Sequence, residues 1–192
     1  MAMMERVKNI LVQPRQEWEV IARERASVAE LYQSYVIPLA AIGPVASIIG
    51  LSVIGFSLPT VGRTRVPLGS SIMQAIVTYI LSLAAIYLLA LIIDALAPTF
   101  SGQKNQLQAL KLAAYSSTPA WLAGIFGLIP ALGFLAILGL YSLYLLYLGV
   151  PVVMNVPQPR VMGYTVSVII AALVIFIAFG AISVMLLPTP TF

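Results

Sequence analysis

Long apolar runs separated by short polar breaks dominate the chain after its first thirty residues. Between Leu31 and Phe192 six side chains are charged, and all six lie at or beside breaks between runs. A water-soluble domain needs polar side chains on every exposed face, whereas a helix in hydrocarbon satisfies its own backbone. The pattern therefore predicts an all-α, polytopic membrane bundle of five transmembrane helices. The predicted spans are residues 35–56, 72–95, 119–133, 134–154 and 162–187.

The boundary between the third and fourth spans rests on a turn signal. The apolar stretch 119–154 is 36 residues long, too long for one helix across about 30 Å of hydrocarbon and suitable for two. Pro130 and Gly133 punctuate this stretch, so the chain is predicted to turn between Ile129 and Gly133. The first leg is short and its turn is uncharged, which leaves a re-entrant hairpin open as the alternative.

The positions of lysine and arginine predict the orientation of the bundle. With a cytoplasmic N-terminus the outer loops hold two basic residues, Arg63 and Arg65, and the cytoplasmic segments hold eight. This is a strong positive-inside bias, and five spans then place the C-terminus outside. A re-entrant hairpin would move Arg160 to the other side and weaken the bias. The eight are Arg6, Lys8, Arg15, Arg23, Arg25, Lys104, Lys111 and Arg160.

Residues 1–33 predict a cytoplasmic, amphipathic N-terminal arm in front of the membrane domain 34–192. Apolar side chains recur at helical spacing as far as Leu11, and Pro14 then begins a second short helix. Trp18 lies on the apolar face of that second helix. A tryptophan in such a position favours the headgroup zone, so the arm is predicted to lie on the membrane.

A second amphipathic segment follows the second span. Lys104, Lys111 and Tyr115 share one side of this segment at helical spacing, with Leu107 on the apolar side. One interpretation is an interfacial helix that caps the bundle. The other is a basic surface that binds anionic lipid headgroups or a cytosolic protein partner.

Polar side chains also occur within the spans. Gln74, Thr78 and Ser82 fall on one face of the second span, and the fourth span carries Tyr144 between two other tyrosines. These groups could line a hydrophilic groove between the two spans for a solute or a lipid headgroup. They could equally form hydrogen bonds between helices or an interfacial aromatic belt.

Asp94 is the acidic side chain of the span regions, near the cytoplasmic end of the second span and four residues before Pro98. A carboxylate near a helix C-terminus is unfavourable, so a compensating group is expected. Two roles stay open, a structural ion pair or a part of a headgroup, ion or proton site. The candidate partners are Lys104, Lys111, Arg23 and Arg25.

Composition narrows the function classes. Apolar residues make up 61% of the chain, and cysteine and histidine are both absent. Thiol chemistry, zinc ligation and serine–histidine catalysis therefore lack their groups, and no phosphate-binding glycine motif occurs. Neither an enzyme nor a bound cofactor or metal is expected. The ten basic residues are spread along the membrane borders, which gives nucleic-acid binding no support.

Several sequence motifs carry a family resemblance. Ser101-Gly102-Gln103-Lys104 leads into a helix that ends in Tyr115-Ser116-Ser117-Thr118-Pro119. The fourth span contains the tyrosine-rich stretch 140–151, and the fifth begins with Gly163-Tyr164-Thr165. With these motifs nearly the whole chain resembles the bacterial branch of the Yip family, named for interaction with Ypt/Rab GTPases. The resemblance implies five spans and a cytoplasmic N-terminus.

The resemblance implies little about activity. Eukaryotic members bind prenylated Rab proteins through a long cytosolic N-terminal region, and this chain has only about thirty residues there, so the Rab-binding role is not carried over. The expected function is that of a non-enzymatic, multi-pass protein of the bacterial inner membrane. It would organise anionic lipids or a protein partner through its basic cytoplasmic face. The alternative is a transporter, channel or lipid scramblase, and homo-oligomerisation stays open.

Overall fold

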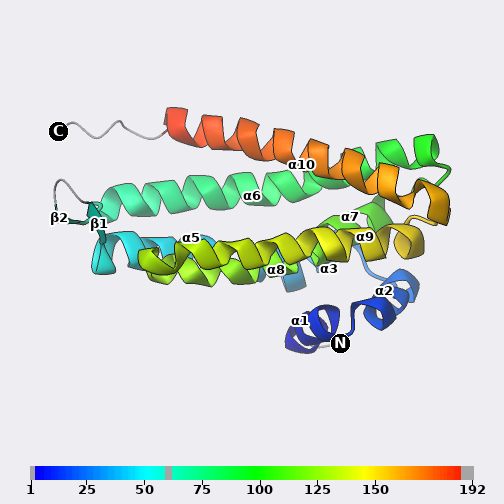
Figure 1. Ribbon diagram of the computed structural model, residues 1–192, viewed down its shortest axis with the longest axis horizontal. Helices are drawn as coiled ribbons and strands as arrows, with labels where there is room; N and C mark the ends of the chain where they lie inside the picture. The colour runs from blue at the N-terminus through cyan, green and yellow to red at the C-terminus, as the bar shows by residue number, and fades with distance from the viewer. Residues whose placement is uncertain (1–2, 59–61, 187–192) are drawn as a thin grey trace.

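The computed structural model describes residues 3–58 and 62–186, and most of them are helical. The long helices lie side by side and form an elongated bundle (Figure 1). A small antiparallel hairpin of strands β1 (Phe56–Leu58) and β2 (Gly62–Thr64) is added to the predicted all-α fold. The helices are α1 (Met3–Val12), α2 (Pro14–Arg23), α3 (Val28–Leu31), η1 (Tyr32–Val36), α4 (Ile37–Ala40), α5 (Ile42–Ile48), η2 (Ile49–Ile54), α6 (Leu68–Leu96), η3 (Ala97–Phe100), α7 (Gln106–Ser116), α8 (Thr118–Ala123), η4 (Gly124–Leu128), η5 (Pro130–Leu140), α9 (Tyr141–Val153) and α10 (Gln158–Leu186).

Four helical segments of the described residues are long and apolar enough to cross a membrane: Val28–Ile54, Leu68–Phe100, Pro130–Val153 and Gln158–Ser183. They correspond to the first, second, fourth and fifth predicted spans. The first of them combines α-helical turns with the wider π turns η1 and η2. The predicted end of the last span at Leu187 and the tail after it lie outside the described residues, as does the side chain of Arg63.

The predicted third span is not among these membrane-length segments of the described residues. Its residues 119–128 lie in α8 and the 3₁₀ helix η4, which together extend for roughly 19 Å at 1.5 Å and 2.0 Å per residue, and residues 130–133 belong to η5. The predicted turn is found where Ile129 leaves the helical conformation and Pro130 begins η5. The chain therefore forms a hairpin with one short and one long leg.

Glycines let the short leg approach the first span closely. A Cβ atom on Gly50 would lie 1.9 Å from the carbonyl oxygen of Gly127, and one on Gly124 would lie 2.8 Å from the Cα atom of Gly43. Backbones can pack at such distances only where no side chain stands between them. The short leg thus follows the first span as far as Gly50, close to the end of that span at Ile54.

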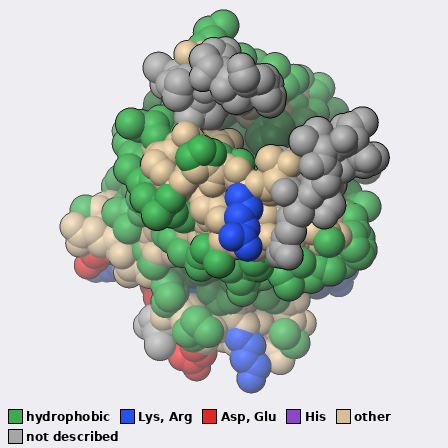
Figure 2. All heavy atoms as spheres, turned by 90° about the vertical axis from the view of Figure 1, so that its left-hand side faces the viewer, with side chains coloured by type: hydrophobic (Ala, Val, Ile, Leu, Met, Phe, Trp, Pro, Cys, Tyr) green, Lys and Arg blue, Asp and Glu red, His purple; other side chains and the backbone are tan. Residues whose placement is uncertain are grey.

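The two ends of the bundle differ in character (Figure 1). The β1–β2 hairpin and the last turns of α10 lie at one end. The other end holds α2, α7 and the connection from α9 to α10, with α1 below the bundle. Seen from the hairpin end, the surface is largely hydrophobic, and most of the visible charges gather at its lower edge (Figure 2).

The protein core lies around α7 and the adjoining ends of the spans. Trp18, Ile21, Leu112, Leu145 and Val150 are fully buried there. In the spans, by contrast, many large apolar side chains are exposed, as expected where hydrocarbon is the solvent. α1 and α2 therefore pack their apolar faces on the bundle. The Trp18 ring is covered by α7 and α9 and does not offer its face to headgroups, contrary to what its position on an amphipathic helix suggests.

We expect Gly50→Ala to lower the free energy of unfolding by about 1–3 kcal/mol, because the new methyl group collides with the backbone of Gly127. Gly69→Ala is the matched control, since a Cβ atom there would meet nothing within 4 Å. The thermal unfolding midpoint of each purified variant in detergent measures the effect. Equal midpoints for the two variants would contradict the close approach of η4 to the first span.

Candidate functional site

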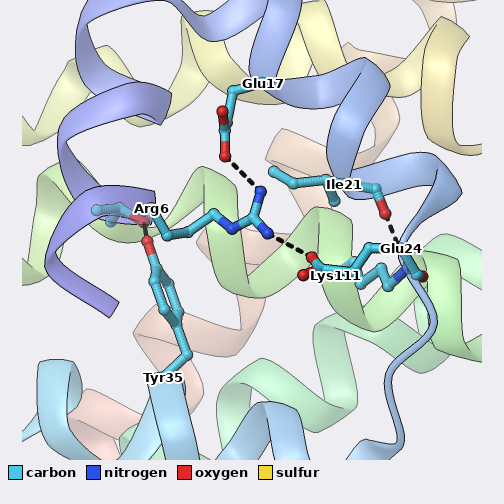
Figure 3. Close-up of polar contacts among 7 residues, drawn as sticks. Arg6, Glu17, Ile21, Glu24, Tyr35 and Lys111 are labelled. Atoms are coloured by element: carbon cyan, nitrogen blue, oxygen red, sulfur yellow. Dashed lines mark hydrogen bonds and ion pairs between the residues drawn. The ribbon is translucent and has the colours of Figure 1, made fainter. Parts of the chain in front are cut away.

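A buried ionic cluster closes the N-terminal arm on itself. The Arg6 guanidinium of α1 lies between the carboxylates of Glu17 on α2 and Glu24 just beyond α2, and it donates a hydrogen bond to each (Figure 3). The side chains of Arg6 and Glu17 are 4% and 6% exposed. Charges this far from water are tolerated only when they are paired and hydrogen-bonded, so Arg6 and Glu17 depend on each other, whereas the Glu24 side chain is 35% exposed.

Lys111 ties the arm to the bundle. Its ammonium group donates to the carbonyl oxygens of Ile21 at 2.8 Å and Glu24 at 2.6 Å, where α2 ends. The last carbonyl groups of a helix lack partners within the helix, and a cation there is favourable. The side chain is 1% exposed, and this burial lowers the pKa of Lys111. Lys111 is therefore no part of an exposed basic surface, in contrast to its predicted position.

Aromatic rings fill the space between the arm and the spans. The Tyr115 ring lies edge-on to Tyr35, with centroids 4.6 Å apart, and edge-on to Trp18 at 6.4 Å. The Arg6 guanidinium sits 5.5 Å from the Tyr115 centroid, within cation–π range. The Tyr35 hydroxyl shares a 2.7 Å hydrogen bond with Thr118, and burial raises the pKa of Tyr115. Tyr115 thus joins the arm, α7 and the first span.

Two cavities flank this docked arm. A cavity of about 410 Å³ is lined by Arg6, Arg25, Glu30 and Tyr115, among others. A second cavity, of about 250 Å³, lies between the end of α2, the segment before α7 and the end of α9. The exposed side chain of Lys104 lines the second cavity. The predicted residues Lys104, Lys111 and Tyr115 therefore surround the arm without forming a single exposed patch.

Asp94 lies apart from the arm, at the packing of α6 on α10. Next to it in the chain, the Ile93 carbonyl oxygen accepts a 2.5 Å hydrogen bond from the Tyr164 hydroxyl. The Asp94 Oδ1 atom is buried, and no hydrogen-bond partner for it is found among the described residues. The ion pairs of the described residues do not include Asp94. The predicted pairing with a lysine or arginine is therefore not found.

The polar face of the second span lines a groove, but the helix opposite it is α10 and not the predicted fourth span. Gln74, Thr78 and Ser82 on α6 face α10 across a groove of about 470 Å³, whose lining is mostly apolar. Tyr144 on α9 is 45% exposed and packs its ring 5.5 Å from that of Tyr141. The groove predicted between the second and fourth spans is thus found between the second and fifth, without Tyr144.

The charged groups that build the arm were missed as candidate residues. The sequence does contain an indication of these ion pairs, because the first thirty residues hold equal numbers of acidic and basic side chains, five of each. Such balance favours pairing within the segment. No group of three or more histidine, cysteine, aspartate or glutamate side chains that could hold a metal ion occurs within residues 3–58 and 62–186.

An elongated bundle with four membrane-length helical segments among the described residues, and a docked, charged arm, defines a polytopic α-helical membrane protein. The chain belongs to the Yip family, since residues 8–179 match the family model described as the Yip1 domain. This confirms the resemblance drawn from the motifs.

Two curated relatives are similar along nearly their whole length. Inner membrane protein YohC of Escherichia coli K12 is 25% identical over 187 residues, which covers 95% of this chain and 96% of that protein. YohC of Escherichia coli O6:H1 shows the same identity and coverage. No solved structure matches the chain. Together with the apolar helices, these relatives confirm the predicted multi-pass, inner-membrane localisation.

We expect Arg6→Gln to destabilise the docked arm by about 3–5 kcal/mol, because it leaves the buried Glu17 carboxylate without its partner. The measurement is iodide quenching of tryptophan fluorescence in a Trp121→Phe background, where Trp18 is the remaining tryptophan, and the quenching rises when the arm opens.

Arg23→Gln is the matched control. It removes an exposed pair with Glu19, whose side chains are 83% and 64% exposed, and such pairs contribute about 0–1 kcal/mol. Equal quenching in the two variants would show that the buried pairs do not hold the arm.

Proposed function

We propose that this Yip family protein is a non-enzymatic membrane protein that gathers anionic lipids at the end of the bundle where the arm docks. The observation that carries the proposal is the division of the basic residues into two groups. Arg6 and Lys111 are buried and engaged by the arm. The others at this end are exposed: Lys8, Arg15, Arg23, Arg25, Lys104 and Arg160.

The docked arm supports this proposal because its exposed lysine and arginine side chains are held at one end of the bundle. Each lysine or arginine near an anionic bilayer surface contributes about 1 kcal/mol of attraction. Lys104 and Arg23 line one cavity, and Arg25 lines the other. Arg160 donates a 2.7 Å hydrogen bond to Ser101, close in sequence to Lys104. These contacts favour a joint surface for several headgroups over isolated charges.

We also infer five crossings, with the arm in the cytoplasm and the end of α10 outside. The short leg supports this topology because it follows the first span nearly to its end. The 3₁₀ helix η4 rises about 2 Å per residue, more than an α-helix does, so a short segment covers a longer distance across the bilayer. The eight basic residues on the arm side of the chain, against two in the outer hairpin, support the cytoplasmic assignment.

The transport alternative receives less support from the geometry. It required a hydrophilic groove between α6 and α9 with Tyr144 in its wall, whereas Gln74 and Thr78 face α10 across a mostly apolar groove. Asp94 is absent from the residues that line this groove. We therefore propose lipid organisation rather than transport.

Single cysteines test the inferred topology, since the natural chain has none. We expect Ile129→Cys, at the turn of the short leg, to react with an impermeant maleimide added outside intact cells. Gln103→Cys, at the opposite end, should react only after the membrane is permeabilised. Absence of Ile129→Cys labelling both before and after permeabilisation would support a re-entrant hairpin, whose turn stays within the bilayer.

Lipid retention tests the proposed function. The protein is reconstituted with equal amounts of phosphatidylglycerol and phosphatidylcholine, extracted in mild detergent, and its bound lipids are measured by mass spectrometry. We expect the wild type to retain mainly phosphatidylglycerol. Replacing the six exposed basic residues by glutamine should lower that preference at least about tenfold, because each contributes about 1 kcal/mol.

Arg65→Gln, which removes an exposed charge at the hairpin end, is the control and should retain phosphatidylglycerol as the wild type does. An equal lipid ratio in all three proteins would contradict the proposal.

A further inference from the structure

The cavity beside Lys104 has the composition of an anion site. It encloses about 250 Å³ between α2, α7 and the end of α9. Two of the residues that line it are basic, Arg23 and Lys104, and most of the others carry amide side chains. The residues that line it include no acidic side chain. The Arg23 side chain is 83% exposed and its guanidinium lies 3.9 Å from Glu19, so it turns away from this exposed pair when it binds an anion in the cavity.

We propose that this cavity binds the phosphate group of one anionic glycerophospholipid, held between Lys104 and Arg23. This inference rests on the proposed function and assigns a defined headgroup site within the basic end. Phosphate oxygens accept several hydrogen bonds at once and bind most strongly where the donors are charged. Lys104 supplies a compact ammonium group with three donors, and Arg23 supplies a planar guanidinium that can bind two oxygens together.

Existing hydrogen bonds orient two amide groups so that their N–H donors are free for the ligand. The Asn105 side-chain oxygen accepts from the backbone N–H of Gln108 at 3.1 Å, which leaves the Asn105 amide nitrogen available. The Gln103 side-chain oxygen accepts a longer, exposed hydrogen bond from Asn155 at 3.4 Å, an arrangement in which the Gln103 amide nitrogen is not the donor. Both residues line the cavity. The cavity therefore combines two cations with two oriented neutral donors.

The segment that carries these donors is held rigidly before any ligand binds. The Gln103 backbone N–H donates to the Met154 carbonyl oxygen at 2.9 Å, and that of Gly102 donates to Ala97 at 2.8 Å. A Cβ atom on Gly102 would lie 2.8 Å from Val156 and 2.9 Å from the Met154 oxygen, so a larger residue does not fit. A preorganised site loses less entropy when it binds its ligand.

A lipid is the source of phosphate that the surroundings favour. Val152 and Val153 at the end of a membrane-length helix line the same cavity as the two cations. An apolar wall next to a cationic one matches the junction of acyl chain and headgroup. A soluble phosphate ester would use only the cationic wall.

The test measures binding to the full-length protein in detergent by the shift of its thermal unfolding midpoint. The probes are dihexanoyl-phosphatidylglycerol, dihexanoyl-phosphatidylcholine and sn-glycerol 3-phosphate, each titrated separately. We expect saturable binding of the phosphatidylglycerol, with the other two at least about tenfold weaker. Lys104→Gln and Arg23→Gln should each weaken it about tenfold or more, the loss expected for one charge-assisted hydrogen bond.

Lys8→Gln and Arg15→Gln are the matched controls, since both side chains are exposed on the arm and neither lines the cavity. Unchanged binding by these controls supports the defined site. If they weaken binding as much as Lys104→Gln does, the basic end binds lipid diffusely, and the site is overturned while the proposed function stands. Equal affinity for sn-glycerol 3-phosphate would overturn the assignment to a lipid, and no binding of any probe would overturn the site.

Discussion

The docking of the arm on the bundle depends on the burial of two cations, Arg6 and Lys111. Arg6 closes α1 on α2 through two glutamates, and Lys111 fastens the end of α2 through backbone oxygens. Removing either cation would leave acceptors unpaired in an environment where their desolvation is costly. Trp18 and Tyr115 then pack in the space that these bonds enclose. The polar bonds thus fix where the apolar contacts form.

This arrangement separates two kinds of apolar burial. In the spans, side chains such as Phe134 and Phe176 remain largely exposed because hydrocarbon solvates them, and close backbone contacts such as Gly50 with Gly127 hold the helices together. Around α7 water would otherwise reach the side chains, so the hydrophobic effect contributes there. The protein core accordingly lies at the end of the bundle where the charged arm covers it.

The difference between burial in hydrocarbon and burial in the protein core explains which features the sequence could predict. The apolar runs, the turn at Ile129 and the family motifs follow from local composition, and the structure contains the runs and the turn. The burial of Trp18 and Lys111 does not follow, because an amphipathic helix has the same pattern whether its apolar face meets lipid or protein. The sequence also did not predict that Gln74 faces α10 across the groove. Helical spacing shows which residues share a face, but it does not show which helix packs against that face.

Buried ion pairs are a poor source of stability, because apolar side chains of similar size often pack as well. Their effect here is better understood as geometric. Apolar contacts alone are not directional, whereas the buried Arg6 guanidinium needs the Glu17 carboxylate beside it, and this pairing restricts how α1 lies on α2. In that arrangement Arg23 and Lys104 line the same cavity. The buried Arg6–Glu17 pair thus determines where the exposed basic side chains of the arm, such as Arg23, are placed.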